Sequence, residues 1–339
     1  MSPDSPSRPI RLALVGAGIF MHDAHLPSLL RLPDHYQIVA VYSRSEQSAR
    51  KLAERLPAPV QLFTDYAKLL AEPTIEAVDI VLPIPTMPAY VAQALASGKH
   101  VISEKPIAPD LAQTQTLLAA YAQHAGTVWM VGENWRYESA FVRSAELVQA
   151  GAIGTPHAAH WAIFAPILPG NKYFGSTWRE SGGLSGGYLL DGGVHHAAAL
   201  RMVIGEISEV SATVKQVAPY LPPADTIAAQ LRFANGALGA YLAGYSLAAP
   251  WPPYLHVIGD QGALRMQRGE VEITRDGQSE VIRLEKFDGV EKELVAFAAA
   301  IRDGAPHRNS PQEAARDLAV VDALLRAAAD GRPVAVAAV

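Results

Sequence analysis

The sequence RLALVGAGIF, residues 11–20, decides the fold. Its first half is an apolar run typical of a buried strand, and Gly16 and Gly18 follow directly, ahead of a segment with helical apolar spacing. The first glycine permits a tight turn, and the second lets the backbone approach a phosphate at the helix N-terminus. The stretch therefore predicts a dinucleotide-binding loop, with Met21 where a full fingerprint has its third glycine. The alternative is an ordinary glycine turn between a strand and a helix.

Beyond this loop, short apolar runs alternate with amphipathic segments as far as residue 131. Repetition of strand, helix and strand predicts a parallel sheet covered by helices on both faces, which is a doubly wound α/β domain. The expected strands are 11–15, 37–42, 77–82, 100–102 and 128–131, and the expected helices include 45–55, 86–97 and 111–123.

After Glu133 the pattern changes to many alternating segments separated by Gly, Asp and Pro, which predicts a large, mostly antiparallel sheet in an α+β domain. Few helices accompany it, so we expect one open face that a second subunit covers in a homodimer or homotetramer. The expected strands are 157–164, 209–217, 226–233, 238–245, 255–258, 263–267, 270–274 and 280–284, and the expected helices are 139–150, 189–204, 292–302 and 312–329. The predicted organisation is a flexible tail over 1–10, a Rossmann domain over 11–132, and a substrate-binding and oligomerisation domain over 133–339.

Composition narrows the class of protein. The chain has 339 residues, of which 50% are hydrophobic and 18% charged, as in a soluble two-domain enzyme. It contains no cysteine, which excludes disulfides, Cys-ligated zinc, iron–sulfur clusters and thiol nucleophiles. The net charge of −5 gives no attraction to nucleic acid or membranes, and no apolar run reaches about 18 residues. We expect residues 1–10 to be a flexible tail rather than a signal peptide. We expect a cytoplasmic protein whose partner is a small molecule.

The second predicted strand ends at Ser43 and Arg44. An NAD-selective site usually has an acidic residue about 20 positions beyond the glycines, where it holds the ribose 2′-hydroxyl. A hydroxyl and a guanidinium suit a 2′-phosphate instead, because Arg forms forked, charge-assisted bonds to phosphate. The sequence favours NADP over NAD, the alternative being that Arg44 is a solvated loop residue.

Glu104-Lys105-Pro106 follows another predicted strand. In open α/β sheets ligands bind at the carboxyl ends of the strands, so a lysine here is a candidate site residue. The alternative is a surface Glu–Lys pair ahead of a proline that starts a helix.

Asp191 and His195 stand four residues apart in a segment expected to be helical, which would direct both side chains to one volume. Together they could orient a substrate and move a proton. The alternatives are a helix N-cap for Asp191 and simple packing for His195. His196 is expected to face elsewhere. A metal site would need a third ligand, and the sequence cannot place His157, His160 or His22 beside this pair, so no metal is predicted.

Together, the Gly16 loop, Glu104-Lys105-Pro106 and the Asp191/His195 pair resemble the Gfo/Idh/MocA oxidoreductases, which include inositol dehydrogenases, glucose–fructose oxidoreductase and sugar reductases. The resemblance spans nearly the whole chain and includes residues 132–137, 151–154, 178–179 and the ending over 303–333. Residues 171–174, 178–179 and 190–195 are most similar to an NADP-linked branch found in fungi and bacteria.

The resemblance implies roles for individual residues. Lys105 would hydrogen-bond the reacting oxygen, Asp191 would hold the substrate, and His195 would exchange the proton. Many members carry an acidic residue where this chain has Ala198, and Met21 makes the phosphate loop bulkier. The expected cofactor-binding residues are Gly16, Gly18, Ile19, Phe20, Ser43, Arg44, Pro83, Glu104, Lys105 and Arg179. The expected substrate-binding residues are Lys105, Asn134, Arg136, Lys172, Tyr173, Trp178, Asp191 and His195.

Three functions fit these expectations. The first is reversible hydride transfer between NADP(H) and a carbonyl or secondary alcohol of a sugar, cyclitol or related polyol. The second is an NADP(H)-binding sensor or assembly subunit without turnover, and the third is a lyase or glycosidase that uses the cofactor transiently, as some relatives in the family do.

Overall fold

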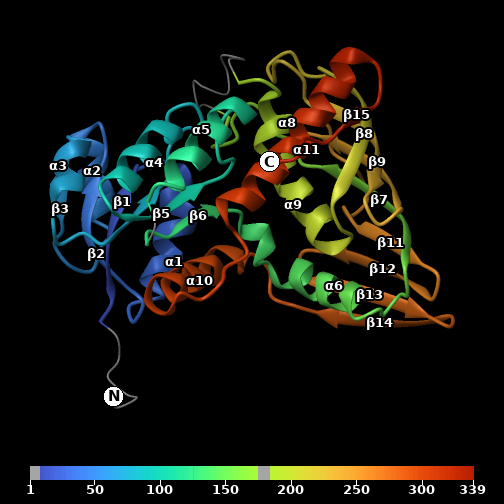
Figure 1. Cartoon of the computed structure of the whole chain (residues 1–339), viewed down its shortest axis with the longest axis horizontal. Coiled ribbons are helices and arrows are strands. Elements are labelled where there is room, and N and C mark those ends of the chain that lie inside the picture. Colours follow the sequence, from blue (N-terminus) through green and yellow to red (C-terminus); the bar gives the residue numbers. More distant parts are fainter. Residues whose placement is uncertain (1–7, 125, 175–183) are drawn as a thin grey trace. The chain divides into compact units, whose positions relative to one another are not determined.

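The computed structural model describes residues 8–124, 126–174 and 184–339. The chain forms two units, each with its own sheet (Figure 1). The first unit comprises Met1–Ala108, Ala112–Gly132 and Val290–Pro311, and the second comprises Pro109–Leu111, Glu133–Gly289 and Gln312–Val339. The sequence placed residues 290–311 in the second domain, whereas they belong to the first unit.

The first unit is built on a six-stranded sheet in the order β3-β2-β1-β4-β5-β6, with every neighbouring pair parallel. The strand order reverses on either side of β1, as in a doubly wound sheet, so the predicted Rossmann architecture is confirmed. The strands are β1 (Ile10–Val15), β2 (Tyr36–Tyr42), β3 (Gln61–Phe63), β4 (Ala77–Ile80), β5 (His100–Glu104) and β6 (Trp129–Gly132).

Side chains fix where the helices of this unit begin. Ser45 accepts a hydrogen bond from the Ser48 amide at the start of α2, and Asp65 accepts one from the Lys68 amide at the start of α3. The segments are the π-helix η1 (Met21–His25), α1 (Leu26–Leu30), α2 (Glu46–Ala53), α3 (Tyr66–Ala71), α4 (Met87–Ala96) and α5 (Leu111–Tyr121).

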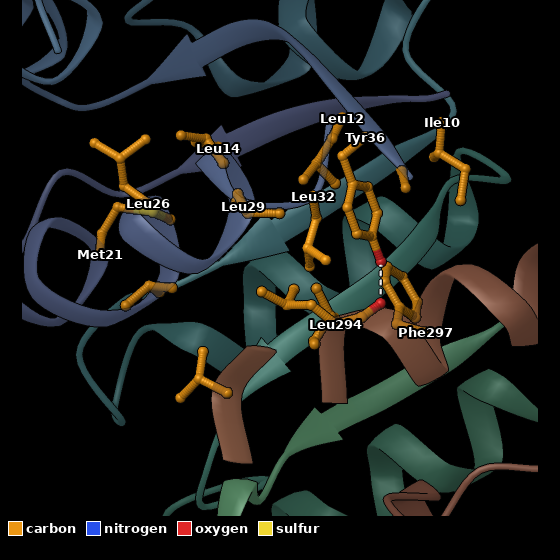
Figure 2. Close-up of a cluster of buried hydrophobic side chains, with 14 of the residues drawn as sticks. Ile10, Leu12, Leu14, Met21, Leu26, Leu29, Leu32, Tyr36, Leu294 and Phe297 are labelled. Carbon is orange, nitrogen blue, oxygen red and sulfur yellow. Dashed lines mark hydrogen bonds between the residues drawn. The ribbon is translucent and has the colours of Figure 1, made fainter. Parts of the chain in front are cut away.

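Helix α10 (Gly289–Asp303) completes the core of the first unit. Its Leu294 and Phe297 are fully buried in one cluster with the apolar side chains of β1, η1 and α1 (Figure 2). The Tyr36 hydroxyl donates a 2.5 Å hydrogen bond to the Leu294 carbonyl. Burial of this apolar face explains why a helix so late in the sequence belongs to the first unit.

The second unit contains a nine-stranded sheet in the order β14-β13-β12-β11-β7-β10-β9-β8-β15. It is mostly antiparallel, as predicted, because β7 and β10 form its one parallel pair. Its strands are β7 (Pro156–Phe164), β8 (Ile207–Lys215), β9 (Thr226–Phe233), β10 (Leu238–Gly244), β11 (Leu255–Gly259), β12 (Gly262–Gln267), β13 (Glu270–Arg275), β14 (Gln278–Arg283) and β15 (Val334–Ala335). Its helices are η2 (Asn134–Arg136, a 3₁₀ turn), α6 (Ser139–Gln149), α8 (Gly187–Asp191), α9 (Gly193–Val203) and α11 (Pro311–Asp330).

The two faces of this sheet differ in burial. Val257, Ala159 and Leu231 share one cross-strand row and are buried, with α9 and α11 against this face. On the opposite face, Ile258 and Leu238 are 47% and 56% exposed. Within the described residues, the chain therefore covers one face and leaves apolar side chains on the other.

Candidate functional site

Gly16 directly follows β1, the first strand of the parallel sheet, and needs to be glycine. Its φ is +105°, and a Cβ there would lie 2.2 Å from the Val81 carbonyl oxygen. Its amide donates a 2.9 Å hydrogen bond to the Tyr42 carbonyl. At Gly18, by contrast, a Cβ would meet no atom within 4 Å. Gly16 makes the close turn, and Gly18 leaves open space beside the backbone, so the loop fits a dinucleotide phosphate.

The next strand, β2, ends beside this loop, with Tyr42 opposite Val15 in register. Ser43 is half-buried, and its amide donates to the Phe63 carbonyl, while Arg44 is exposed. The Ser45 side chain caps α2. Ser43 and Arg44, which the sequence predicts to meet a ligand phosphate, thus follow β2 directly, and the Ser43 hydroxyl accepts a hydrogen bond from the Ser45 amide.

The Lys105 turn lies at the same edge of the sheet. Ile80 of β4 pairs with both Val15 and Ser103, so the carboxyl ends of β1, β4 and β5 are neighbours. Lys105 follows β5 directly and is half-buried, and a cis peptide joins it to Pro106. Pro83 follows β4 and is also half-buried. The first unit thus gathers the predicted glycine loop, Ser43, Arg44, Pro83 and Lys105 at one edge of its sheet.

Beneath this edge lies a buried histidine that the sequence analysis missed. His25 Nδ1 is 2.8 Å from Asp79 Oδ2, and Nε2 is 3.0 Å from Glu104 Oε1. The side chains of His25 and Asp79 are 0% exposed and that of Glu104 is 11% exposed. Burial alone would lower the pKa of His25, but the two carboxylates outweigh it and raise this pKa well above its ordinary value. The signal in the sequence was Asp79, a charge inside an apolar strand that needs a buried partner.

In the second unit, His195 of α9 is held by a carboxylate. Its Nδ1 lies 2.6 Å from Glu133 Oε1, and the Glu133 side chain is almost fully buried. The indole of Trp135 stacks on the imidazole, with ring centroids 5.0 Å apart and an interplanar angle of 10°. The Arg268 guanidinium lies 4.8 Å from the centroid of that indole. These contacts fix the ring and its Nδ1, which leaves Nε2 as the atom able to exchange a proton with a ligand.

The sequence predicted one helix for Asp191 and His195, but the structure places them in two. Asp191 is the last residue of α8, and α9 begins after Gly192. A Cβ at Gly192 would lie 1.9 Å from the Tyr245 hydroxyl oxygen, so this glycine admits the tyrosine against the junction. Burial, then the neighbouring Tyr241 and Asp191, raise the pKa of Tyr245 well above its usual value. His196 faces elsewhere, as expected, with Nδ1 2.6 Å from the Tyr241 hydroxyl.

The structure does not support Arg136 as a substrate ligand. Its guanidinium is buried and bonds both carboxylate oxygens of Asp317, at 2.7 and 2.8 Å. Arg201 of α9 bonds the same carboxylate and also pairs with Glu313 of α11. Arg136 therefore holds η2 to α11 rather than facing a ligand.

The remaining predicted substrate residues differ in exposure. Asn134 is half-buried in η2, Lys172 is exposed, and its Nζ lies 5.2 Å from the centroid of the half-buried Tyr173 ring. Trp178 and Arg179 lie outside the described residues.

Over 8–124, 126–174 and 184–339, no group of three or more His, Asp or Glu side chains could hold a metal ion. No helix in these ranges is both long enough and apolar enough to span a membrane.

The glycine loop on a doubly wound sheet is typical of a dinucleotide-binding domain. Residues 10–133 match the model of the oxidoreductase family with an NAD-binding Rossmann fold, and residues 145–336 match that family's C-terminal α/β domain. The chain belongs to the Gfo/Idh/MocA family of oxidoreductases, and it is an NAD(P)-dependent dehydrogenase or reductase.

Relatives match over nearly their whole length. A dehydrogenase of Fusarium mangiferae is 33% identical over 94% of this chain and 97% of its own. The dTDP-3,4-didehydro-2,6-dideoxy-alpha-D-glucose 3-reductase of Streptomyces violaceoruber is 30% identical over 95% of this chain and 96% of its own. The crystal structure of an oxidoreductase from Thermotoga maritima has a TM-score of 0.91 at 33% identity and covers 97% of this chain and 99% of that one.

Proposed function

We propose that this protein transfers hydride reversibly between NADP(H) and a carbonyl or secondary alcohol carbon of a sugar, cyclitol or related polyol. The observation that carries the proposal is His195, held through Nδ1 by Glu133 with a distance of 2.6 Å. A histidine fixed in this way by a carboxylate is the arrangement of a general acid–base, which moves a proton when hydride transfer creates or consumes an alkoxide. Similarity to a sugar 3-reductase supports the substrate class.

The nicotinamide would supply or accept the hydride. The chain's own residues would manage charge and protons. The Lys105 ammonium would stabilise the developing oxyanion, because a cation placed where negative charge develops lowers the barrier. His195 would give its Nε2 proton to that oxygen during reduction and take it back during oxidation. Asp191, nearly buried at the end of α8, would accept hydrogen bonds from substrate hydroxyls.

A substrate panel tests this function. We expect NADPH oxidation with one or more keto sugars or keto cyclitols, and His195→Ala should reduce kcat by about 10²- to 10⁴-fold while cofactor still binds. Tight NADPH binding with no turnover across the panel would replace the proposal with a sensor or assembly subunit. Release of a leaving group without net change in NADPH absorbance would identify a lyase or glycosidase.

Preference for NADP is part of the same proposal. Arg44 is exposed between β2 and α2, and Ser43 precedes it, so a guanidinium and a hydroxyl stand where an acidic residue would select NAD. We expect kcat/KM to be higher with NADPH than with NADH. Arg44→Ala should reduce the ratio of the NADPH value to the NADH value by at least tenfold. Arg50→Ala, which removes an exposed arginine paired with Glu46 on α2, is the matched control. A clear NADH preference in the wild type would overturn this part.

We also propose that the open sheet face of the second unit forms a homodimer or homotetramer interface, in a cytoplasmic enzyme with no nucleic acid or membrane partner. Ile258 and Leu238 lie in one row of that face and are exposed in the single chain. In light scattering after size exclusion, Ile258→Glu combined with Leu238→Glu should give a smaller species than the wild type. A wild-type protein that is already monomeric would refute this interface.

A further inference from the structure

A charged group in the first unit links the two loops that the proposed function uses. His25 ends η1, the π-helix that follows the glycine loop, and Glu104 ends β5 immediately before Lys105. We propose that His25 is a positioning residue: as a cation it joins Asp79 and Glu104 and thereby holds the Lys105 turn in a fixed relation to the phosphate loop. This inference rests on the proposed function, because it assigns Lys105 its catalytic part.

The hydrogen bonds favour the cationic ring. Each ring nitrogen faces a carboxylate oxygen, at 2.8 Å for Asp79 and 3.0 Å for Glu104. A neutral imidazole carries one N–H and can donate to one of them, whereas an imidazolium donates to both. Two buried carboxylates without a bridging cation would be strongly unfavourable, because charge taken out of water needs a partner. The raised pKa of His25 agrees with this assignment.

Gly132 leaves the space that the Glu104 carboxylate occupies. A Cβ built on Gly132 of β6 would lie 3.1 Å from Glu104 Oε1 and 3.3 Å from the Ser103 carbonyl oxygen. Gly132 therefore leaves just enough room for the carboxylate to turn into the sheet toward His25. The sequence suggested that Glu104 contacts the cofactor directly. Because Glu104 makes this interior contact instead, we assign it to anchoring Lys105.

The topology makes the link between the loops short. Asp79 lies in β4, which pairs with β1 on one side and β5 on the other. His25 thus connects the segment after β1 to β4 and to the last residue of β5 through one ring. Phe20, at the start of η1, packs edge-on against this ring with centroids 5.4 Å apart. A change in the position or charge of the ring would therefore displace both the phosphate loop and Lys105.

Kinetics of single and double variants test the route of action. If His25 acts through Glu104, His25→Gln and Glu104→Gln should each lower kcat, on the order of 100-fold for a catalytic group displaced by about 1 Å. The double variant should then be no slower than the slower single variant. The cofactor Kd, measured without substrate, should change less than the kcat. His22→Gln, three residues earlier in η1 and half-buried, is the control and should behave as wild type. Multiplying effects in the double variant, or wild-type kcat in folded His25→Gln, would overturn the proposal.

Two measurements without substrate keep this inference separate from the proposed function. In nitrogen NMR of the full chain, both ring nitrogens of His25 should remain protonated at about pH 7, where an ordinary histidine with a pKa of about 6.5 is mostly neutral. In hydrogen exchange, His25→Gln should speed the backbone amides of both residues 16–20 and residues 104–108, while His22→Gln leaves them unchanged. Faster exchange confined to the neighbours of residue 25, or a mostly neutral His25 ring at about pH 7, would overturn the positioning role even if turnover on sugars is established. If no substrate is found, the same two results still decide it.

Discussion

Replacing Glu133 with glutamine tests the assignment of His195 most directly. The Glu133 carboxylate accepts from His195 Nδ1 at 2.6 Å and is almost fully buried. Glutamine keeps the length and volume of the side chain but removes its charge. It can also present an N–H to Nδ1, in which case the ring cannot carry protons on both nitrogens, and the imidazolium that donates from Nε2 loses its stabilising partner.

The size of the effect follows from the contact. A hydrogen bond with a charged partner contributes about 1.5–3 kcal/mol, and about 1.4 kcal/mol corresponds to a factor of ten in rate. If this contact is fully used in the transition state, Glu133→Gln should lower kcat by about 10- to 100-fold. The KM for substrate should change little, because the Glu133 carboxylate is almost fully buried and acts through the histidine.

The assay is steady-state NADPH oxidation with the best substrate of the panel, with cofactor Kd from NADPH fluorescence in a separate titration. Glu146→Gln removes the charge of an exposed glutamate that pairs with Arg143 on α6, and it serves as the matched control. A kcat within twofold of wild type in folded Glu133→Gln would refute the reasoning. A loss of rate that weaker cofactor binding explains entirely would also refute the reasoning.

Three further predictions concern stability. Gly16→Ala should lower the unfolding free energy in urea by at least about 1–3 kcal/mol because of backbone strain alone, and the 2.2 Å contact to Val81 adds to this loss. Gly18→Ala, in open space, should leave stability unchanged. Equal losses in the two variants would contradict the structure. Asp317→Ala removes the carboxylate that two buried arginines share, and we expect it to lower the unfolding free energy by about 3–5 kcal/mol in the same assay. An unchanged unfolding free energy would show that this network contributes nothing to stability. For His25 the folded pKa is raised above the unfolded value of about 6.5, so its stabilisation is complete below that pH and is lost as pH rises through the folded pKa. The difference in unfolding free energy between wild type and His25→Gln should therefore narrow in alkaline buffer, and a difference that widens would contradict the sign.

The fold was predictable because its signals are local. Apolar runs and amphipathic spacing located β1, β2, β4, β5 and β6 to within a few residues, and the turn-separated alternating segments located the second sheet. The short β3 and α3 escaped, since three and six residues give too little periodicity. The break at Gly192 escaped as well, because helical dihedral angles continue through it and apolar spacing does not reveal it.

The site was predictable only in part, for a related reason. Gly16, Arg44 and Lys105 could be placed because each follows a recognisable strand. Glu133 and His195 are 62 positions apart, and His25 lies 54 positions from Asp79 and 79 from Glu104, so no sequence pattern pairs them.

The error at Arg136 has another physical origin. A basic residue beside tryptophan and tyrosine fits a pocket for a hydroxylated ligand, but the same cation equally suits a buried pair. Its partner, Asp317, is 181 positions away on α11. Only the folded chain could choose between the two roles.

The late position of α10 in the sequence also sets the order in which this protein can fold during its synthesis. Domains generally fold as the ribosome releases them, beginning with the N-terminal one. Here the core of the first unit includes Leu294 and Phe297, which pack with Tyr36, so that core stays incomplete until the chain has been made through Val290–Pro311. Nearly all of the second unit's sheet is synthesised in the meantime. Apolar side chains of the newly made Rossmann sheet therefore stay exposed until α10 has been synthesised. A chain that terminates early at residue 133 should be prone to aggregation.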